Sequence, residues 1–225
     1  MDFSIIFNYE LKSLAKSAKS TILSLVLVSL FWGIFFALNI FSGIFDDRPD
    51  EFLLIWFLFF ALVASSGFAN ISFARERLSG AFEILFASGI SRKTIFFAKL
   101  IFVQTASFLW GILSLVFAVF TARIFGIYVE FHSLILFAIL LFFCATFLIN
   151  SISAYLTIIN INQRVVNMIN LGVLAVLSSV IYLINAETII GKFIILGIVI
   201  IPTIPVIILS QKALFTDKAI QNIVY

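Results

Sequence analysis

The chain has 225 residues, of which 63% are hydrophobic and only 11% are charged, and its formal net charge is +3. Soluble domains carry about a quarter charged residues, so this composition excludes a water-soluble globular protein. A single cysteine, Cys144, excludes a disulfide framework and a paired-thiol metal site. We predict no metal site and no nucleic-acid partner, because a small positive charge on so apolar a chain is typical of cations that face lipid headgroups.

Residues 1–20 are predicted to form an interfacial amphipathic helix. One face collects Phe3, Ile6, Phe7, Leu11 and Leu14 at helical spacing, and another carries Lys12, Lys16 and Lys19. Such a helix lies in the headgroup layer, with its apolar stripe toward the lipid tails and its lysines toward anionic lipids. The alternative is an ordinary helical lead-in whose lysines only set the orientation of the chain.

Six uncharged, apolar runs follow, each 19 to 31 residues long. About 20 apolar residues cross a hydrocarbon core of about 30 Å as a helix. Barrel strands would alternate in polarity, whereas these runs are continuously apolar. We therefore predict an all-α membrane protein of one domain, residues 1–225, with transmembrane helices at about 21–45, 52–74, 95–122, 133–155, 165–185 and 193–210.

The basic residues are distributed unequally between the two sides of this six-span arrangement. One side receives Lys12, Lys16, Lys19, Arg75, Arg77, Arg92, Lys93, Lys99, Arg164, Lys212 and Lys218, and the other receives Arg48, Arg123 and Lys192. Cytoplasmic loops of membrane proteins carry the excess of Lys and Arg. The pattern therefore predicts that both termini and the 75–93 loop are cytoplasmic, in a multi-pass protein of the cell inner membrane.

The 75–93 loop, between the second and third spans, carries the second predicted amphipathic helix. Leu78, Phe82 and Leu85 fall on one helical face, Ser79 is suited to cap the helix, and Gly89 is suited to end it. An apolar face bounded by charges is typical of a helix that docks in a groove of a partner. A surface loop that dips into the membrane interface explains the pattern nearly as well.

The residues of this loop resemble the signature of ABC-2-type transporter permeases. The matching segments are Arg75-Glu76-Arg77, Ser79-Gly80-Ala81-Phe82-Glu83-Ile84-Leu85, Ala87-Ser88-Gly89-Ile90-Ser91-Arg92 and Lys99-Leu100. The sequence departs from the family pattern at Ala81, Phe82, Gly89 and Ala98, where the family has Thr, Leu, Pro and Gly. These replacements keep size or turn capacity, and the predicted topology also resembles that of the family.

The resemblance implies that residues 79–87 form a coupling helix that binds a cytoplasmic ATP-binding subunit, with Glu83 as a polar contact. The implied docking residues are Leu78, Ser79, Gly80, Phe82, Glu83 and Leu85, flanked by Arg75, Glu76, Arg77, Arg92 and Lys93. Since the chain has no phosphate-binding loop motif, ATP and Mg²⁺ belong to the partner, and we predict neither enzymatic activity nor a cofactor here. The implied assembly adds a second permease copy or a related chain, with two ATPase subunits.

The predicted spans give less information about the cargo, the molecule that such a permease would transport. We expect Lys99 to extend to the cytoplasmic interface and Arg123 to the external one, which leaves only neutral polar groups within the spans. Asn39, Ser65, Ser66, Asn70, Gln104, Asn150, Asn167 and Asn170 are such groups, and helix-packing contacts are their commonest role. A hydrophobic or amphipathic cargo, moved by export, fits these spans better than a metal ion.

Three alternatives stay open at this point. The short external loops and the Pro202 to Pro205 ending resemble the haem-exporter B group of cytochrome c maturation, although His132 is better read as an interfacial histidine than as a haem ligand. An intramembrane protease needs a serine and a histidine in reach of each other, and Ser65 or Ser66 and His132 are predicted at different depths. A non-transporting membrane scaffold is the third alternative.

Overall fold

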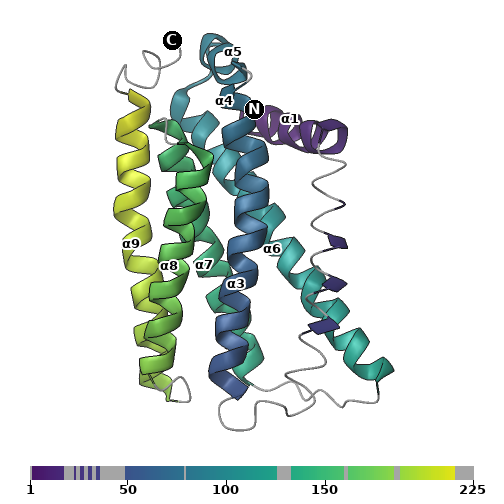
Figure 1. Ribbon diagram of the computed structural model, residues 1–225. Helices are drawn as coiled ribbons and strands as arrows, with labels where there is room; N and C mark the ends of the chain where they lie inside the picture. Colours follow the sequence, from purple (N-terminus) through teal and green to yellow (C-terminus); the bar gives the residue numbers. More distant parts are fainter. Residues whose placement is uncertain are drawn as a thin grey trace.

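The computed structural model describes residues 2–17, 49–78, 80–125, 133–159, 162–184 and 188–215, with short pieces between residues 23 and 35 (Figure 1). Its elements are α1 (Asp2–Ser17), α3 (Pro49–Ala69), the π-helical turn η1 (Asn70–Ala74), α4 (Arg75–Leu78), α5 (Ala81–Ala87), α6 (Arg92–Ile124), α7 (Ser133–Ile158), α8 (Gln163–Leu183) and α9 (Ile189–Phe215). The predicted all-helical class is confirmed for this part of the chain.

Five helices in the described part are long and apolar enough to cross a membrane. They cover Leu54–Arg77, Arg92–Thr121, Ile135–Ile158, Gln163–Leu183 and Ile189–Ala213. These segments correspond to the second to sixth predicted spans. The predicted first span, 21–45, lies outside the described residues except for a few positions such as 26–27 and 30–31, which are helical.

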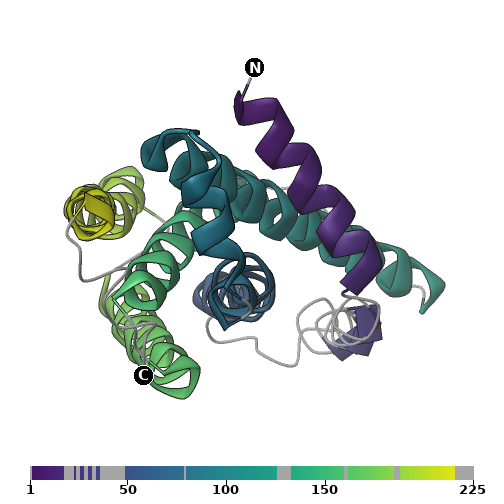
Figure 2. The ribbon, with the colours of Figure 1, turned by 90° about the horizontal axis from the view of Figure 1, so that it is seen from above.

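Helix α7 is the centre of the bundle. It packs against α3, α6, α8 and α9, and its inner residues Ala138, Leu141, Ala145 and Ile149 are completely buried (Figures 1 and 2). Helices in lipid gain little from the hydrophobic effect and associate mainly through close packing, which small residues permit. The alternation of alanine with large side chains along α7 therefore explains its central place.

Gly111 is a point of close contact between α6 and α7. A β-carbon at this position would overlap the ring of Phe142, which is 1% exposed. The Phe142 ring also lies 5.9 Å from the ring of Phe57 and 6.3 Å from that of Phe108, measured between centroids. The absence of a side chain at Gly111 thus makes room for an aromatic cluster shared by α3, α6 and α7.

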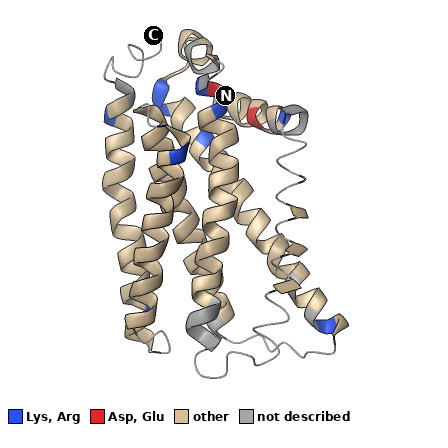
Figure 3. Ribbon diagram, viewed as in Figure 1, with Lys and Arg blue, Asp and Glu red and all other residues tan. Residues whose placement is uncertain are grey.

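Most of the described charges lie at one end of the bundle. Helix α1 crosses this end beside α6, α5 projects beyond it, and α9 finishes there (Figures 1 and 2). Figure 3 shows Lys, Arg and acidic residues of α1 and α4 gathered here, whereas Arg123 and Lys192 lie at the opposite end. This separation of charge agrees with the predicted topology, in which the α5 end is cytoplasmic, and the orientation itself stays a prediction.

Candidate functional site

Helix α1 packs on the protein with part of the face that we predicted to lie in lipid. Ile6 is 1% exposed and contacts Ile95 and Ala98 of α6. The ring of Phe7 meets that of Phe102 edge-on, at 5.6 Å between centroids. Since Phe3 and Leu11 are exposed, the apolar stripe is shared between α6 and the surroundings. Lys12 is exposed, the side chain of Lys16 is not described, and Lys19 lies outside the described residues.

A buried ionic cluster fixes α1 to the spans. The ammonium group of Lys99, in α6, pairs with the carboxylates of both Glu10, in α1, and Glu76, in α4. Lys99 is 0% exposed, Glu10 1% and Glu76 5%. Buried charges are stable only when they are paired and hydrogen-bonded. The position of each of these three side chains therefore depends on the other two. The prediction that Lys99 extends to the interface is therefore wrong.

The π-helical turn η1 supplies the remaining contacts of this cluster. Ser72 donates its hydroxyl proton to Glu10 Oε2 at 2.9 Å, and its backbone carbonyl accepts from Lys99 Nζ at 3.2 Å. The backbone N–H of Arg75 bonds to the carbonyl of Asn70, five residues earlier, which marks the wide turn. Such turns release backbone groups from the regular α-helical pattern and occur often at functional sites. Here the turn brings the Ser72 carbonyl to a buried ammonium group.

Arg77, the next residue after Glu76, connects α4 to α7. Its guanidinium Nη1 donates to the carbonyls of Thr157 and Ile158, the latter at 3.1 Å, at the last turn of α7. A cation at a helix carboxyl end satisfies carbonyls that have no partner within the helix and interacts favourably with the helix dipole. Two consecutive residues of α4 therefore hold α1, α6 and α7 together.

Helix α5 continues from this junction beyond the end of the bundle. Gly80 precedes it with φ 72°, and Gly89 follows it with φ 79°, a left-handed conformation that glycine adopts without strain. The predicted stop at Gly89 is confirmed. The predicted cap at Ser79 is wrong, because Gly80 occupies the N-cap position and makes no side-chain cap bond.

The two sides of α5 have different environments. Leu85 and Phe86 pack against the cluster of Ile6, Ile95 and Ala98, and the guanidinium carbon of Arg92 lies 5.3 Å from the centroid of the Phe86 ring. Ile84 is 74% exposed. Leu85, which we predicted to anchor a partner, thus contacts its own chain, and Ile84 is an exposed large apolar residue of α5.

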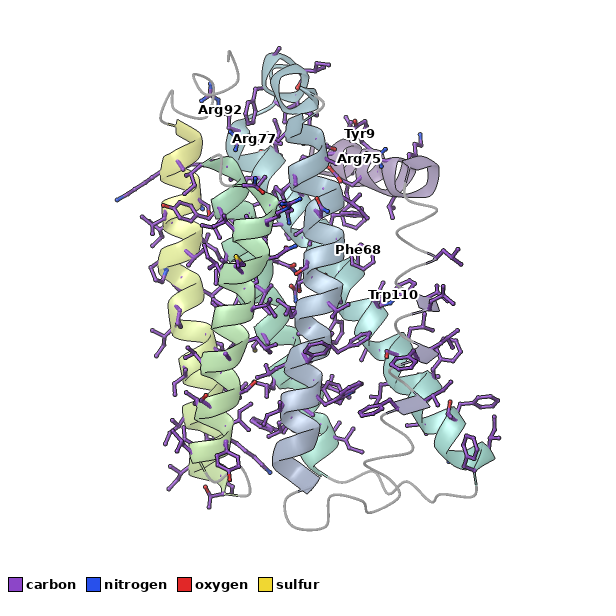
Figure 4. The ribbon with its side chains drawn as sticks, viewed as in Figure 1. Tyr9, Phe68, Arg75, Arg77, Arg92 and Trp110 are labelled. Atoms are coloured by element: carbon purple, nitrogen blue, oxygen red, sulfur yellow. The ribbon has the colours of Figure 1, made fainter. Side chains whose placement is uncertain are left out.

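The other predicted docking residues are only partly described. Ser79 lies outside the described residues, as do the side chains of Leu78, Phe82 and Glu83. Among the flanking charges, Glu76 and Arg77 belong to the junction, while Arg75 and Lys93 are exposed. Figure 4 shows Arg75 and Tyr9 on the α1 side of this end, with Arg77 and Arg92 on the other. Partial burial, and then the carboxylates of Glu76 and Glu10, raise the pKa of the Tyr9 hydroxyl.

Sequence reasoning missed Glu10 and misplaced Lys99. Lys99 follows Arg92, the first residue of α6, by seven positions, which is about 10 Å of helix and too deep for a boundary residue. An ionisable residue inside a span is a candidate functional residue, and that depth was a usable signal. Glu10 gave none, because a lone acid in a lysine-bearing amphipathic helix is indistinguishable from a solvated one.

No protein-family model, curated protein or solved structure matches the chain.

Proposed function

We propose that the chain is the membrane-spanning subunit of a transporter that is driven by ATP hydrolysis in a separate cytoplasmic subunit. The observation that carries the proposal is the α4 junction, where Glu76 and Arg77 connect the base of the outward-facing α5 to α1, α6 and α7. A helix that receives force from a partner needs such a rigid attachment to the spans. The resemblance of residues 75–92 to ABC-2-type permeases supports the same function.

The proposed coupling works through paired charges rather than through apolar contact alone. A displacement of α5 displaces α4, and Glu76 cannot separate from Lys99 without leaving buried charges unpaired, which is costly. Movement of α5 is therefore passed to α6 through Lys99 and to α7 through Arg77. Transport further requires that the cargo bind the two resulting arrangements of the spans with different affinity.

The proposed cargo is hydrophobic or amphipathic, and the proposed assembly contains a second permease copy or a related chain. Within the described spans, the charges that are not at helix ends belong to the Lys99 cluster, and the remaining interior polar groups are neutral. This composition favours a cargo with a large apolar part over a free ion. Nothing specific favours a haem cargo over other amphipathic molecules.

The test compares two isoleucines of equal exposure at opposite ends of the bundle. Ile84→Asp changes a residue that is 74% exposed on α5, and Ile189→Asp changes one that is 73% exposed at the start of α9. The tagged chain is purified in detergent from its native cells and assayed for a co-purified ATPase subunit and for ATP hydrolysis. We expect Ile84→Asp to weaken ATPase binding roughly tenfold or more, as loss of an interface anchor does, and Ile189→Asp to have no effect.

Phe82→Asp and Glu83→Lys extend this test to the residues that the resemblance implicates. Equal ATPase binding and hydrolysis in the wild type, Ile84→Asp and Phe82→Asp proteins would contradict the docking role of α5. Membrane insertion, measured by extraction at high pH, serves as the control for folding.

A further inference from the structure

The interior of the bundle contains a second polar group of residues, separate from the ionic cluster. Gln104 of α6 donates to the Thr146 hydroxyl at 2.9 Å and accepts from Asn150 Nδ2 at 3.0 Å. Asn170 of α8 donates to the Ser153 hydroxyl of α7 at 2.8 Å. These bonds form two polar groups, one between α6 and α7 and one between α7 and α8, which are neighbours along α7 because Ser153 follows Asn150 by about one helical turn. We call the two groups together the polar track.

Three polar atoms on this track are buried and have no hydrogen-bond partner in the described part of the chain. They are Ser107 Oγ, Asn150 Oδ1 and Asn170 Oδ1, and each of these residues is 0% exposed. Ser107 follows Gln104 by one turn on α6, so the three atoms lie along the track over about two helical turns, roughly 10 Å. Native interiors rarely leave such groups unsatisfied, and several together indicate a ligand.

The track lies inside the apolar core rather than in the headgroup layer. Asn170 is seven residues from the start of α8, Asn150 eight from the end of α7 and Gln104 twelve from the start of α6, which corresponds to depths of about 10 to 18 Å from the charged end. Lipid therefore cannot satisfy these atoms. At the deep end of the track, where Phe108 follows Ser107, the Phe142 ring packs on those of Phe57, Phe60 and Phe108.

We propose that this track, from Ser107 through Asn150 to Asn170, is an intramembrane binding site for a neutral hydrogen-bond donor, and that its occupant is water. Two amide oxygens and a hydroxyl are acceptors for which water is the smallest donor. A buried water commonly makes about three hydrogen bonds to otherwise unsatisfied groups. A cation is disfavoured because the track offers it no carboxylate, and a neutral site in an apolar core compensates poorly for lost hydration.

Apolar side chains border this site on both sides along the bundle. Toward the charged end lie buried residues such as Leu100, Val103 and Ala154, and toward the opposite end Thr146 is followed one turn deeper by Phe142. The inference is independent of the ATPase partner, because it concerns the chain in its resting arrangement.

Thiol chemistry tests the proposal directly, because the chain has only one cysteine. In a Cys144→Ala background, Ser107→Cys places a thiol on the track, and Ala138→Cys places one in the apolar core of α7, with both parent residues 0% exposed. Each protein is incubated with silver ion, denatured and labelled with a maleimide to count unreacted thiols. The thiolate is the reactive form, and burial among apolar side chains suppresses its formation. We therefore expect silver ion to block the Ser107→Cys thiol about tenfold faster or more than the Ala138→Cys thiol.

Ser107→Ala gives a second measurement that does not depend on a new thiol. Ser107 Oγ has no partner in the described chain, so in a dry interior the variant removes an unsatisfied group and raises Tm. In a hydrated interior it removes a bond to water, and we expect Tm to fall by a few degrees, about 2 to 4 °C. Equal, slow silver reaction at both positions together with a raised Tm would overturn the proposal. Stabilisation of the wild type by Na⁺ or K⁺ relative to choline would also overturn it, because the occupant would then be a cation.

Discussion

Lys99 has an environment unlike that of its neighbours along the chain. It stands in α6 among apolar residues, yet its ammonium group is completely buried between two carboxylates. The Ser72 hydroxyl adds a hydrogen bond to this cluster by donating to Glu10. Lys99 is the shared partner of both carboxyl groups, so its removal is the costliest single change to the cluster.

The first residue-scale prediction concerns this lysine. Lys99→Met leaves the carboxylates of Glu10 and Glu76 buried without a cation, and we expect it to lower the free energy of unfolding by about 3 to 5 kcal/mol. Thermal unfolding in detergent measures the change. Lys12→Met, which removes an exposed lysine of α1, serves as the control.

Neutralising the whole cluster distinguishes the contribution of charge pairing to stability from that of side-chain shape. The triple variant Glu10→Gln, Glu76→Gln, Lys99→Met keeps the volumes of the side chains and leaves no unpaired charge, so we expect much of the lost stability to return. A triple variant as unstable as Lys99→Met would mean that the length of the lysine side chain, and not its charge, is what the site requires.

The second residue-scale prediction compares two glycines. Gly111→Ala forces a β-carbon into the ring of Phe142, and overpacking of this kind costs about 1 to 3 kcal/mol. Gly172→Ala adds a β-carbon with nothing within 4 Å, so it should stabilise α8 by about 0.5 to 1 kcal/mol. Opposite shifts of Tm in the two variants are expected, and shifts of the same sign would show that the α6–α7 contact is not tight.

At the scale of elements, α4 is short but joins several helices. Its four residues follow the π-helical turn, and the wide turn sets the direction in which Glu76 and Arg77 leave the second span. Arg77 lies at the last turn of α7, where it donates to two carbonyls that the helix itself leaves unsatisfied. The position of α5 relative to the bundle depends on these contacts together with the packing of Leu85 and Phe86 on α1 and α6.

The element-scale prediction tests this joint. Arg77→Met removes the donor to the carbonyls of Thr157 and Ile158, and we expect a loss of about 1 to 3 kcal/mol of stability, concentrated at the α4–α7 contact. Hydrogen exchange should increase at the last turn of α7. Arg164→Met, at an exposed arginine of α8, is the matched control, and equal exchange in the two variants would contradict the role of Arg77.

At the scale of the whole molecule, the separation of charge between the two ends predicts how the bundle is oriented in the membrane. The α5 end carries most of the described Lys and Arg (Figure 3), and membrane proteins keep such an excess in the cytoplasm. The predicted orientation is also the one that the proposed cytoplasmic ATPase partner requires.

The whole-molecule prediction is measured by thiol labelling in intact cells. In the Cys144→Ala background, we expect an impermeant reagent applied outside to label Thr188→Cys, at the exposed start of α9, and to leave Ser88→Cys, at the exposed end of α5, unlabelled until the membrane is opened. Labelling of Ser88→Cys from outside would reverse the orientation and remove α5 from the reach of any cytoplasmic partner.

The amino-acid sequence by itself determines the class of this protein. Long uncharged runs can satisfy their backbone only as helices in lipid, so the spans from 52 to 210 and the stop at Gly89 follow from local composition and conformation. The unequal distribution of Lys and Arg between the two ends can likewise be recognised from the sequence alone.

Only the tertiary structure decided which residues form the junction and the polar track. Glu10 and Lys99 are 89 positions apart, and Asn170 reaches Ser153 on a neighbouring helix. Local patterns place a charge or an amide on a helix. The free-energy cost of burying that group depends on the partners that the other helices supply, and therefore on how the helices pack. For this reason Lys99, which looks like a boundary residue in the sequence, is the buried centre of the candidate site.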